Sequence, residues 1–371
     1  MAGGKKEKII DCHIHVTDTE GVSRDALAGN MEKIGMSNMN IVCTISMEKP
    51  RVNCNPEALL YKNSYPDRFY ISGGLDYTKH FNKEKGLDED LRDQVDRLKD
   101  IGFDGIKMIE GKPNVYKDMN LPLNSPVYSM YYQRLEETGF PVIFHAGDPA
   151  EFWNPDPDAR KPWERVWGMP GPSYEDGTYV ALEELYWQVD EIMGRNPGLK
   201  IVFAHFLFLG GDLERAGYFL KTYEGFHLDV TPGLEMYYQF SENIEKTREF
   251  FIKWQDRIMF GTDLGVGKGF DAESYNRSVS ELRRYFETYD EFVCEHWKLW
   301  GGTIKGLGLP EEVLDKLFGR NFRKVFGENP KPLNNTKAKE ECIKQKKLAE
   351  GSNNKEEAEK LDRIISNIKI R

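Results

Sequence analysis

Eight short segments rich in β-branched and apolar residues recur along most of this chain. Each has the length of a β-strand, and the longer amphipathic stretches between them carry helix start and stop signals. Strand and helix alternate from Ile9 to about Gly327, an average of about 40 residues per unit, which is generous but ordinary for a (β/α)8 barrel. The expected strands are 9–15, 40–46, 69–75, 104–110, 141–147, 200–206, 226–232 and 258–264.

An open, doubly wound sheet is the alternative arrangement of such units. We favour an α/β fold of the distorted TIM barrel type over residues 9–327, because the strands number eight and no glycine-rich nucleotide fingerprint follows the first of them. Local signals support the helices. Asn55 and Ser125 each precede a proline, as at helix starts, while Gly102 and Gly139 stand where a helix end favours a positive φ.

Two segments interrupt this alternation. Residues 148–177 are too long for a plain loop and are rich in proline and tryptophan, so we expect a folded lid over the barrel mouth. Residues 328–371 are expected to form a helical tail. Its apolar stripe should dock on its own barrel or on a second subunit, which leaves a homo-oligomer open; the stripe comprises Leu361, Ile364, Ile365 and Ile368.

Composition excludes several classes of partner. The chain has 51 Lys and Arg against 61 Asp and Glu, a net charge of −10, which argues against nucleic acid. No charge-free apolar run approaches the roughly 18 to 20 residues that cross a bilayer, so we expect no membrane partner. The five cysteines are scattered and odd in number, which is typical of reduced thiols. A cytoplasmic location is therefore expected.

The histidines carry most of the functional information. The chain has only seven, and four of them stand at the ends of expected strands: His13, His15, His145 and His205. The last strand ends in Asp263. Because side chains alternate faces along a strand, His13 and His15 project the same way, and their partners on other strands can converge at the C-terminal rim of the barrel, where barrel active sites lie.

Imidazoles and a carboxylate aimed at one point form a ligand set for a divalent ion, with Zn²⁺ as the first choice. A single histidine of this kind is more often an ordinary hydrogen-bonded rim residue, but random placement seldom puts four at strand ends. We therefore expect one divalent ion. Its expected ligands are His13, His15, His145 and Asp263.

These segments resemble a known family, the amidohydrolase superfamily, and within it the amidohydrolase 2 branch, which also holds nonoxidative decarboxylases. The resemblance lies in IIDCHIH, GFPVIFHAG, NPGLKIVFAHF with the following Gly210 and Gly211, IMFGTD, and LFGRNFRKVFG. It implies metal binding by the first three histidines. It further implies that Asp263 is a ligand or the base, and that His205 is the second catalytic histidine.

Lys107, in the fourth strand, is expected to face the barrel interior, where an unpaired charge is costly. In two-metal members of the superfamily, a lysine of this strand becomes a carbamate that bridges the ions. The alternative is an ammonium paired with Asp229, Asp11 or an acidic substrate. We favour the second interpretation, because the amidohydrolase 2 branch generally looks mononuclear.

These groups suit hydrolysis of a C–N or C–O bond in a small cyclic or acyl substrate. A metal-bound water would attack, Asp263 would take its proton, and His205 would stabilise charge on the substrate oxygen. The same groups can instead protonate an unsaturated carbon and release carbon dioxide, so a decarboxylase of an aromatic or unsaturated acid is the alternative. A non-catalytic small-molecule-binding barrel is a third hypothesis, which the complete ligand set disfavours.

Rim residues are candidates for substrate contact. Arginine and lysine there would favour a substrate bearing a carboxylate, and tryptophan would favour a flat apolar ring. The principal candidates are Lys107, Trp153, Arg160 and Tyr237, and further ones are Arg51, Asn53, Trp163, Arg165, Trp167, Glu235, Tyr238 and Lys268.

Overall fold

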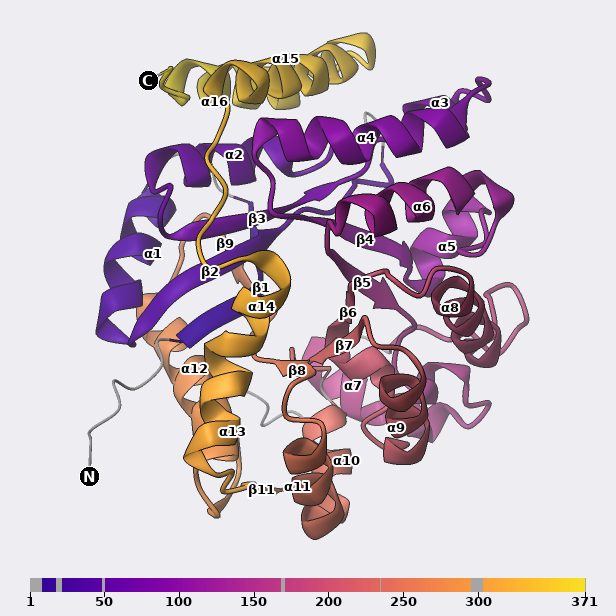
Figure 1. Ribbon diagram of the computed structural model, residues 1–371, viewed down its shortest axis with the longest axis vertical. Coiled ribbons are helices and arrows are strands. Elements are labelled where there is room, and N and C mark those ends of the chain that lie inside the picture. The colour runs from indigo at the N-terminus through magenta and orange to yellow at the C-terminus, as the bar shows by residue number, and fades with distance from the viewer. Residues whose placement is uncertain are drawn as a thin grey trace.

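The computed structural model describes residues 9–17, 22–48, 51–167, 171–233, 235–294 and 303–370. Parallel strands curl around a common axis and helices cover the outside (Figure 1). The strand order is β8-β7-β6-β5-β4-β3-β2-β1-β9. The strands are β1 (Ile9–Val16), β2 (Met36–Val42), β3 (Phe69–Gly74), β4 (Gly105–Gly111), β5 (Val142–Ala146), β6 (Ile201–Phe203), β7 (Phe226–Asp229), β8 (Ile258–Met259) and β9 (Leu264–Val266).

The expected eighth strand is split in two around Asp263. Its first part, β8, pairs with β7, and its second part, β9, pairs with β1. Between them the Cys12 N–H donates to the Phe260 carbonyl (3.0 Å), and the Asp263 N–H donates to the His13 carbonyl (2.9 Å). These bonds join the two edges of the sheet, so the prediction of a TIM barrel is confirmed.

Helices follow the strands in the expected alternation. They are α1 (Val22–Lys33), α2 (Asn55–Ser64), α3 (Thr78–Phe81), α4 (Leu87–Ile101), α5 (Pro113–Met119), α6 (Ser129–Thr138), α7 (Lys161–Trp167), α8 (Leu182–Arg195), α9 (Leu213–Thr222), α10 (Met236–Glu242), α11 (Ile244–Lys253), α12 (Ala272–Glu287), α13 (Glu311–Asp315), α14 (Asn321–Phe326), α15 (Asn335–Gly351) and α16 (Lys355–Asn367). A short hairpin joins β10 (Glu291–Phe292) and β11 (Ile304–Lys305).

Three of the four expected helix boundaries are confirmed. Gly102 and Gly139 end α4 and α6 with φ of 108° and 60°, and the Ser125 side chain accepts a bond from the Val127 N–H. Asn55 is the exception, because Cys54 precedes the helix instead. The Asn55 amide is used otherwise: it bonds to both the N–H and the carbonyl of Gly74 at the end of β3.

The N-terminal end of the barrel is closed by a separate apolar cluster. Side chains from β1, β3, β5, β6 and β8 pack there against α14, which lies across this end (Figure 1). Tyr70 and Phe322 meet edge to face, 4.9 Å apart. With this end filled, the polar side chains of the interior gather toward the C-terminal ends of the strands.

The chain after the barrel packs back onto it. Helices α15 and α16 lie against α2 and α4 (Figure 1). Three residues of the predicted apolar stripe, Leu361, Ile364 and Ile368, are buried. Gln345 accepts a bond from the Asn53 N–H (3.3 Å), so the tail also touches the loop that follows β2.

One ion pair fixes α16 to α2, and we expect its loss to weaken the docking of the tail. Lys360 Nζ lies 2.8 Å from Oε1 of Glu57, a buried carboxylate. Lys360→Met should destabilise the protein by about 1–3 kcal/mol, because Glu57 is left buried without its donor. Thermal unfolding measures this loss. Lys355→Met, at an exposed position of the same helix, is the control, and equal unfolding temperatures for the two variants would contradict the prediction.

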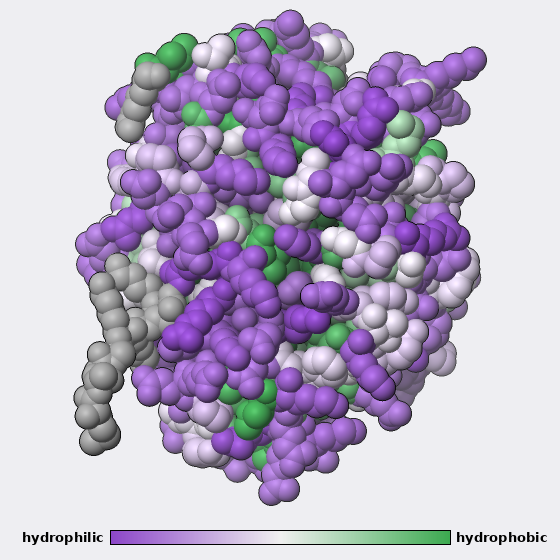
Figure 2. Space-filling view, viewed as in Figure 1, coloured by the Kyte–Doolittle hydropathy of each residue, from purple (hydrophilic) through white to green (hydrophobic). Residues whose placement is uncertain are grey.

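The visible surface is mainly hydrophilic, with small separated apolar areas (Figure 2). Within the described parts of the chain, no helix is both long and apolar enough to span a membrane.

Candidate active site

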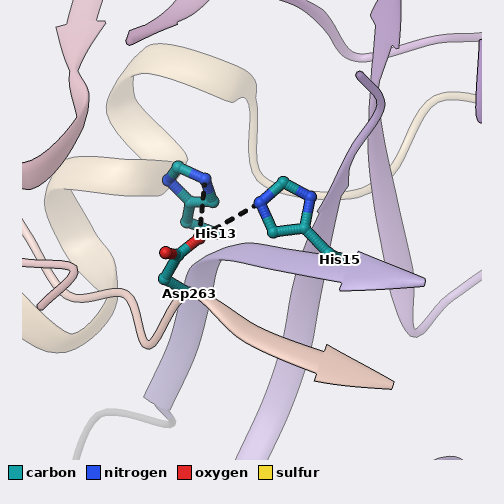
Figure 3. Close-up of side chains that lie close together, drawn as sticks. All are labelled: His13, His15 and Asp263. Carbon is teal, nitrogen blue, oxygen red and sulfur yellow. Dashed lines mark hydrogen bonds and ion pairs between the residues drawn. The ribbon is translucent and has the colours of Figure 1, made fainter. Parts of the chain in front are cut away.

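His13, His15 and Asp263 come together at the C-terminal end of β1 (Figure 3). One ligand atom from each residue lies within 4.8 Å of the others. Asp263 Oδ1 is 3.1 Å from Nε2 of His15 and 3.4 Å from Nε2 of His13. The two histidines project to one side of β1, as the strand alternation predicts, and their ring centroids are 5.3 Å apart.

The backbone at Asp263 aims its carboxylate at the histidines. Asp263 has a φ of +56°, which interrupts the strand between β8 and β9. Burial alone raises the pKa of this carboxyl, but the hydrogen bond from His15 and the neighbouring imidazoles outweigh burial and hold the pKa well below its ordinary value. Asp263 is therefore an ionised acceptor at neutral pH.

His13 is held in one tautomer by Asp229, which ends β7. The Nδ1 atom of His13 lies 3.1 Å from Asp229 Oδ2. Burial alone would raise the pKa of Asp229, but the hydrogen bond to His13 and the nearby imidazoles outweigh burial and hold this pKa below its ordinary value. The Asp229 carboxylate is therefore the acceptor, and Nδ1 of His13 carries the proton. Burial lowers the pKa of His13 itself to about 4. At neutral pH the Nε2 atom therefore carries a lone pair, and it lies 3.4 Å from Asp263 Oδ1.

Lys107 faces the barrel interior, as expected. Its Nζ donates to Nε2 of His13 at 3.3 Å, whereas Asp11, one of the two predicted partners, bonds to Thr262 and to the His13 N–H. Burial lowers the pKa of Lys107 to about 8, although Asp263 and Asp229 oppose that shift. The amine thus lies beside the cluster without a direct carboxylate contact.

His205 lies just after β6, in a left-handed turn that the strand pattern did not predict. Residues 205–208 all have φ between 52° and 56°. The His205 N–H donates to Asp229 Oδ1 (2.9 Å) and to Thr231 Oγ1 (3.1 Å), and these bonds hold the turn. Its ring centroid is 5.6 Å from that of His13. Burial lowers the pKa of His205, so the ring is neutral at pH 7.

His145 is adjacent to the cluster but is not part of it. Its ring centroid is 4.8 Å from that of His205, whereas its Nε2 lies 3.1 Å from the Gly147 carbonyl and 3.6 Å from Asp148 Oδ1. Burial lowers the pKa of His145 well below its ordinary value. The structure therefore brings three of the four expected ligands into one group, and the fourth lies at its edge.

The segment after β5 forms a small core of its own. Phe152, Trp163 and Tyr174 are buried together, and Trp153 packs against them while its Nε1 donates to the Val180 carbonyl (3.0 Å). The segment meets the site through Tyr174, whose hydroxyl donates to Asp148 Oδ2 (2.7 Å). Coverage of the metal mouth by these tryptophans stays a prediction.

Other expected substrate residues have partners elsewhere. Arg160 Nη1 donates to the Asn154 carbonyl (2.8 Å) within the segment after β5. Tyr237 is fully buried, donates to the Val230 carbonyl (2.7 Å) and packs on Tyr285, which are the contacts of a core residue. Their roles in substrate binding remain predictions. The side chains of Arg165 and Trp167 lie outside the described residues.

Several supporting residues were not predicted. Asp229 was predicted only as a possible partner for Lys107. It ends a strand, as Asp263 was expected to do, and this place at a strand end was the signal that could have identified it. Asp148 binds Lys112 Nζ (2.8 Å) and Tyr174 beside His145. These contacts depend on loops that meet only in the folded chain, so no local pattern indicated them.

Comparisons with known proteins identify the family. The crystal structure of a protein described as amidohydrolase II is 15% identical; the match covers 86% of this chain and 100% of that protein's chain, with a TM-score of 0.53. An uncharacterized TIM-barrel protein from Bordetella bronchiseptica is 14% identical, with coverages of 85% and 97% and a TM-score of 0.52. A dihydroxybenzoic acid decarboxylase from Polaromonas sp. JS666, solved with manganese and 2-nitroresorcinol, is 14% identical, with coverages of 86% and 97% and a TM-score of 0.50.

At these identities the likeness shows a shared fold. No curated protein matches the sequence. The family described as amidohydrolase, in its second branch, matches residues 10–327, which is most of the chain and includes every residue of the cluster. This chain therefore belongs to the amidohydrolase family.

Proposed function

We propose that this protein is a metal-dependent hydrolase that cleaves a C–N or C–O bond of a small cyclic or acyl compound. The observation that carries the proposal is the group of ligand atoms from His13, His15 and Asp263 within 4.8 Å of one another. His145 is the fourth candidate ligand. One divalent ion, with Zn²⁺ as the first choice, is the proposed cofactor.

The donor set fits such an ion. Two imidazole nitrogens and a carboxylate oxygen are ligand types that Zn²⁺ and similar ions prefer. His13 Nε2 and the Asp263 carboxylate oxygen lie 3.4 Å apart, and a divalent ion shared by these two acceptors would replace the Lys107 ammonium that donates to Nε2 in this structure. Manganese, the ion in the Polaromonas decarboxylase structure, is the second ion to test.

The side chains around the cluster have distinct roles in this proposal. A divalent ion lowers the pKa of a bound water and polarises a carbonyl. Asp263, ionised at neutral pH, accepts the proton of the attacking water and returns it to the leaving group. The neutral His205 ring donates a hydrogen bond to the substrate oxygen that gains charge, and Lys107 adds positive charge on the same side.

Elemental analysis of the purified protein, beside a panel of lactams, amides, lactones and aromatic acids, tests the proposal. We expect one equivalent of a divalent ion and hydrolysis that a chelator abolishes and the ion restores. Carbon dioxide release from an aromatic acid without hydrolysis would identify a decarboxylase instead. Two equivalents of metal would assign Lys107 as a bridging carbamate.

Asp229→Asn should weaken metal binding about 10- to 100-fold, the usual effect of losing a carboxylate that orients a ligand histidine. The cause is the lost charge opposite Nδ1 of His13, which fixes the tautomer and raises the basicity of Nε2. Competition with a calibrated chelator measures the affinity. Asp93→Asn, at an exposed carboxylate on α4, is the control, and an unchanged affinity in Asp229→Asn would rule out the orienting role.

A further inference from the structure

Glu235, directly after β7, is a buried acid whose carboxylate oxygens have no hydrogen-bond partner. The side chain is only 2% exposed, and both Oε1 and Oε2 are enclosed. Among the described residues, no lysine, arginine or histidine forms an ion pair with it. Burying a carboxyl without a hydrogen-bond partner costs folding free energy, so its presence here indicates a role in binding or catalysis and not in stability.

The loop around Glu235 is built to make room for this carboxyl. A Cβ at Gly233 would lie 2.8 Å from Glu235 Oε1, so the absence of a side chain at Gly233 leaves room for the carboxyl in this position. One helical turn later, Gln239 Oε1 is also buried without a partner. Gly210 makes room for it, since a Cβ there would lie 2.7 Å from that oxygen.

A second acid with an unpaired oxygen approaches from the segment after β5. Glu151 Oε2 is buried without a partner. Burial, together with smaller contributions from the nearby charges of Glu151 and Asp148, raises the pKa of Glu235 to about 8, so the three acids lie near one another. Asp148 lies 3.6 Å from His145, so these oxygens belong to the same rim as the histidine cluster.

A metal ion does not suit this place. In the described part of the chain, the one group of acid, cysteine and histidine ligand atoms within metal-binding distance is His13, His15 and Asp263. Held ionised by a bound cation, the Glu235 carboxylate only accepts hydrogen bonds, as the Gln239 oxygen does, and such oxygens require a ligand that donates hydrogen bonds. Several N–H groups on one planar end, as in a primary amide or an amidine, match carboxylate and amide oxygens best.

We propose that Glu235, Gln239 and Glu151 form a subsite that binds the N–H-bearing end of the substrate. This inference rests on the hydrolase proposed above and narrows its substrates to nitrogen-containing compounds, whose C–N bond is the one cleaved. Glu235 is a specificity-determining residue in this scheme, and Lys107 and His205 serve the opposite, electron-rich end of the substrate.

Benzamidine, a flat ring that ends in an amidinium, is the probe, and benzoate is the matched probe of opposite charge. Calorimetry on the holoenzyme should show benzamidine binding at least tenfold more tightly than benzoate. Glu235→Gln, which keeps the shape of the side chain, should weaken benzamidine binding about 10- to 100-fold. Glu151→Gln should weaken it in the same direction. Glu175→Gln, at an exposed acid of the same segment, is the control and should bind as the wild type does.

Equal affinities of wild type and Glu235→Gln, or tighter binding of benzoate, would overturn the subsite. Folding does not obscure the result, because Glu235→Gln removes an unpaired buried carboxyl and its unfolding temperature should stay equal or rise. His13→Ala separates this inference from the proposed function. It should lose metal yet keep benzamidine affinity, so a failed metal assignment and a failed subsite give different results.

Discussion

His13→Ala is expected to lose most of the bound metal and to lower turnover about 10³-fold or more, because a catalytic ion supplies several kcal/mol of transition-state stabilisation. His13 has the most strictly fixed position of the proposed ligands. It is fully buried, its Nδ1 is bonded to Asp229, and its Nε2 lies 3.4 Å from Asp263 Oδ1. Elemental analysis and turnover of the best panel substrate measure both losses.

The matched control is His80→Ala. His80 lies in α3 and its Nε2 bonds to the Met119 carbonyl (2.7 Å), so it is a partly buried histidine away from the cluster. Its removal should leave metal content at the wild-type value. One full equivalent of metal in His13→Ala would mean that the ion lies elsewhere, even if turnover fell.

The strands could be predicted from the sequence where ordinary turns bound the apolar segments. The expected segment 69–75 and β3 (Phe69–Gly74) agree, as do 104–110 and β4 (Gly105–Gly111). The second strand was placed at 40–46 but runs over Met36–Val42, so that prediction was wrong by four residues. Its polar residues explain the error: the buried Asn40 amide bonds to the Cys12 carbonyl and to Ser72, partners that only the folded sheet supplies.

The strand ends at the site were harder to predict than the strands themselves. The sixth strand stops at Phe203, two residues before His205, and the eighth is broken around Asp263. Both residues have left-handed backbones, which cost free energy in any residue with a side chain and are favoured by no local pattern here. The bonds that support His205 come from Asp229, at the end of β7, and from Thr231, just after it.

The sequence was therefore sufficient to predict which residues lie at the site, but less sufficient to predict which contacts their side chains make. The rule that barrel residues at strand ends converge was enough to predict that His13, His15 and Asp263 meet. It was not enough to predict that the His145 Nε2 turns toward Gly147, or that Tyr237 packs in the core, because those outcomes depend on how loops and helices pack at long range.

His205→Asn is expected to lower turnover about 10²- to 10⁴-fold, the usual loss when a group that exchanges protons or hydrogen bonds with the reacting atoms is removed. Asparagine suits this position because it tolerates the left-handed conformation, here a φ of +55°, that alanine would strain. The backbone bonds to Asp229 and Thr231 do not involve the side chain. The turn should therefore survive the substitution, and the imidazole alone is lost.

The metal content of the His205→Asn variant shows whether the lower turnover comes from a lost catalytic group or from a lost metal ligand. His205 is outside the group of three ligand atoms, so His205→Asn should keep its full equivalent of metal while turnover falls. Asp263→Asn is the comparison, because asparagine also tolerates φ +56° there, but it should lose both metal and turnover. His227→Asn controls for removing a buried imidazole, since that ring bonds to the Gly225 carbonyl at the opposite end of β7. Loss of metal in His205→Asn would make His205 a ligand, and wild-type turnover would remove it from the reaction.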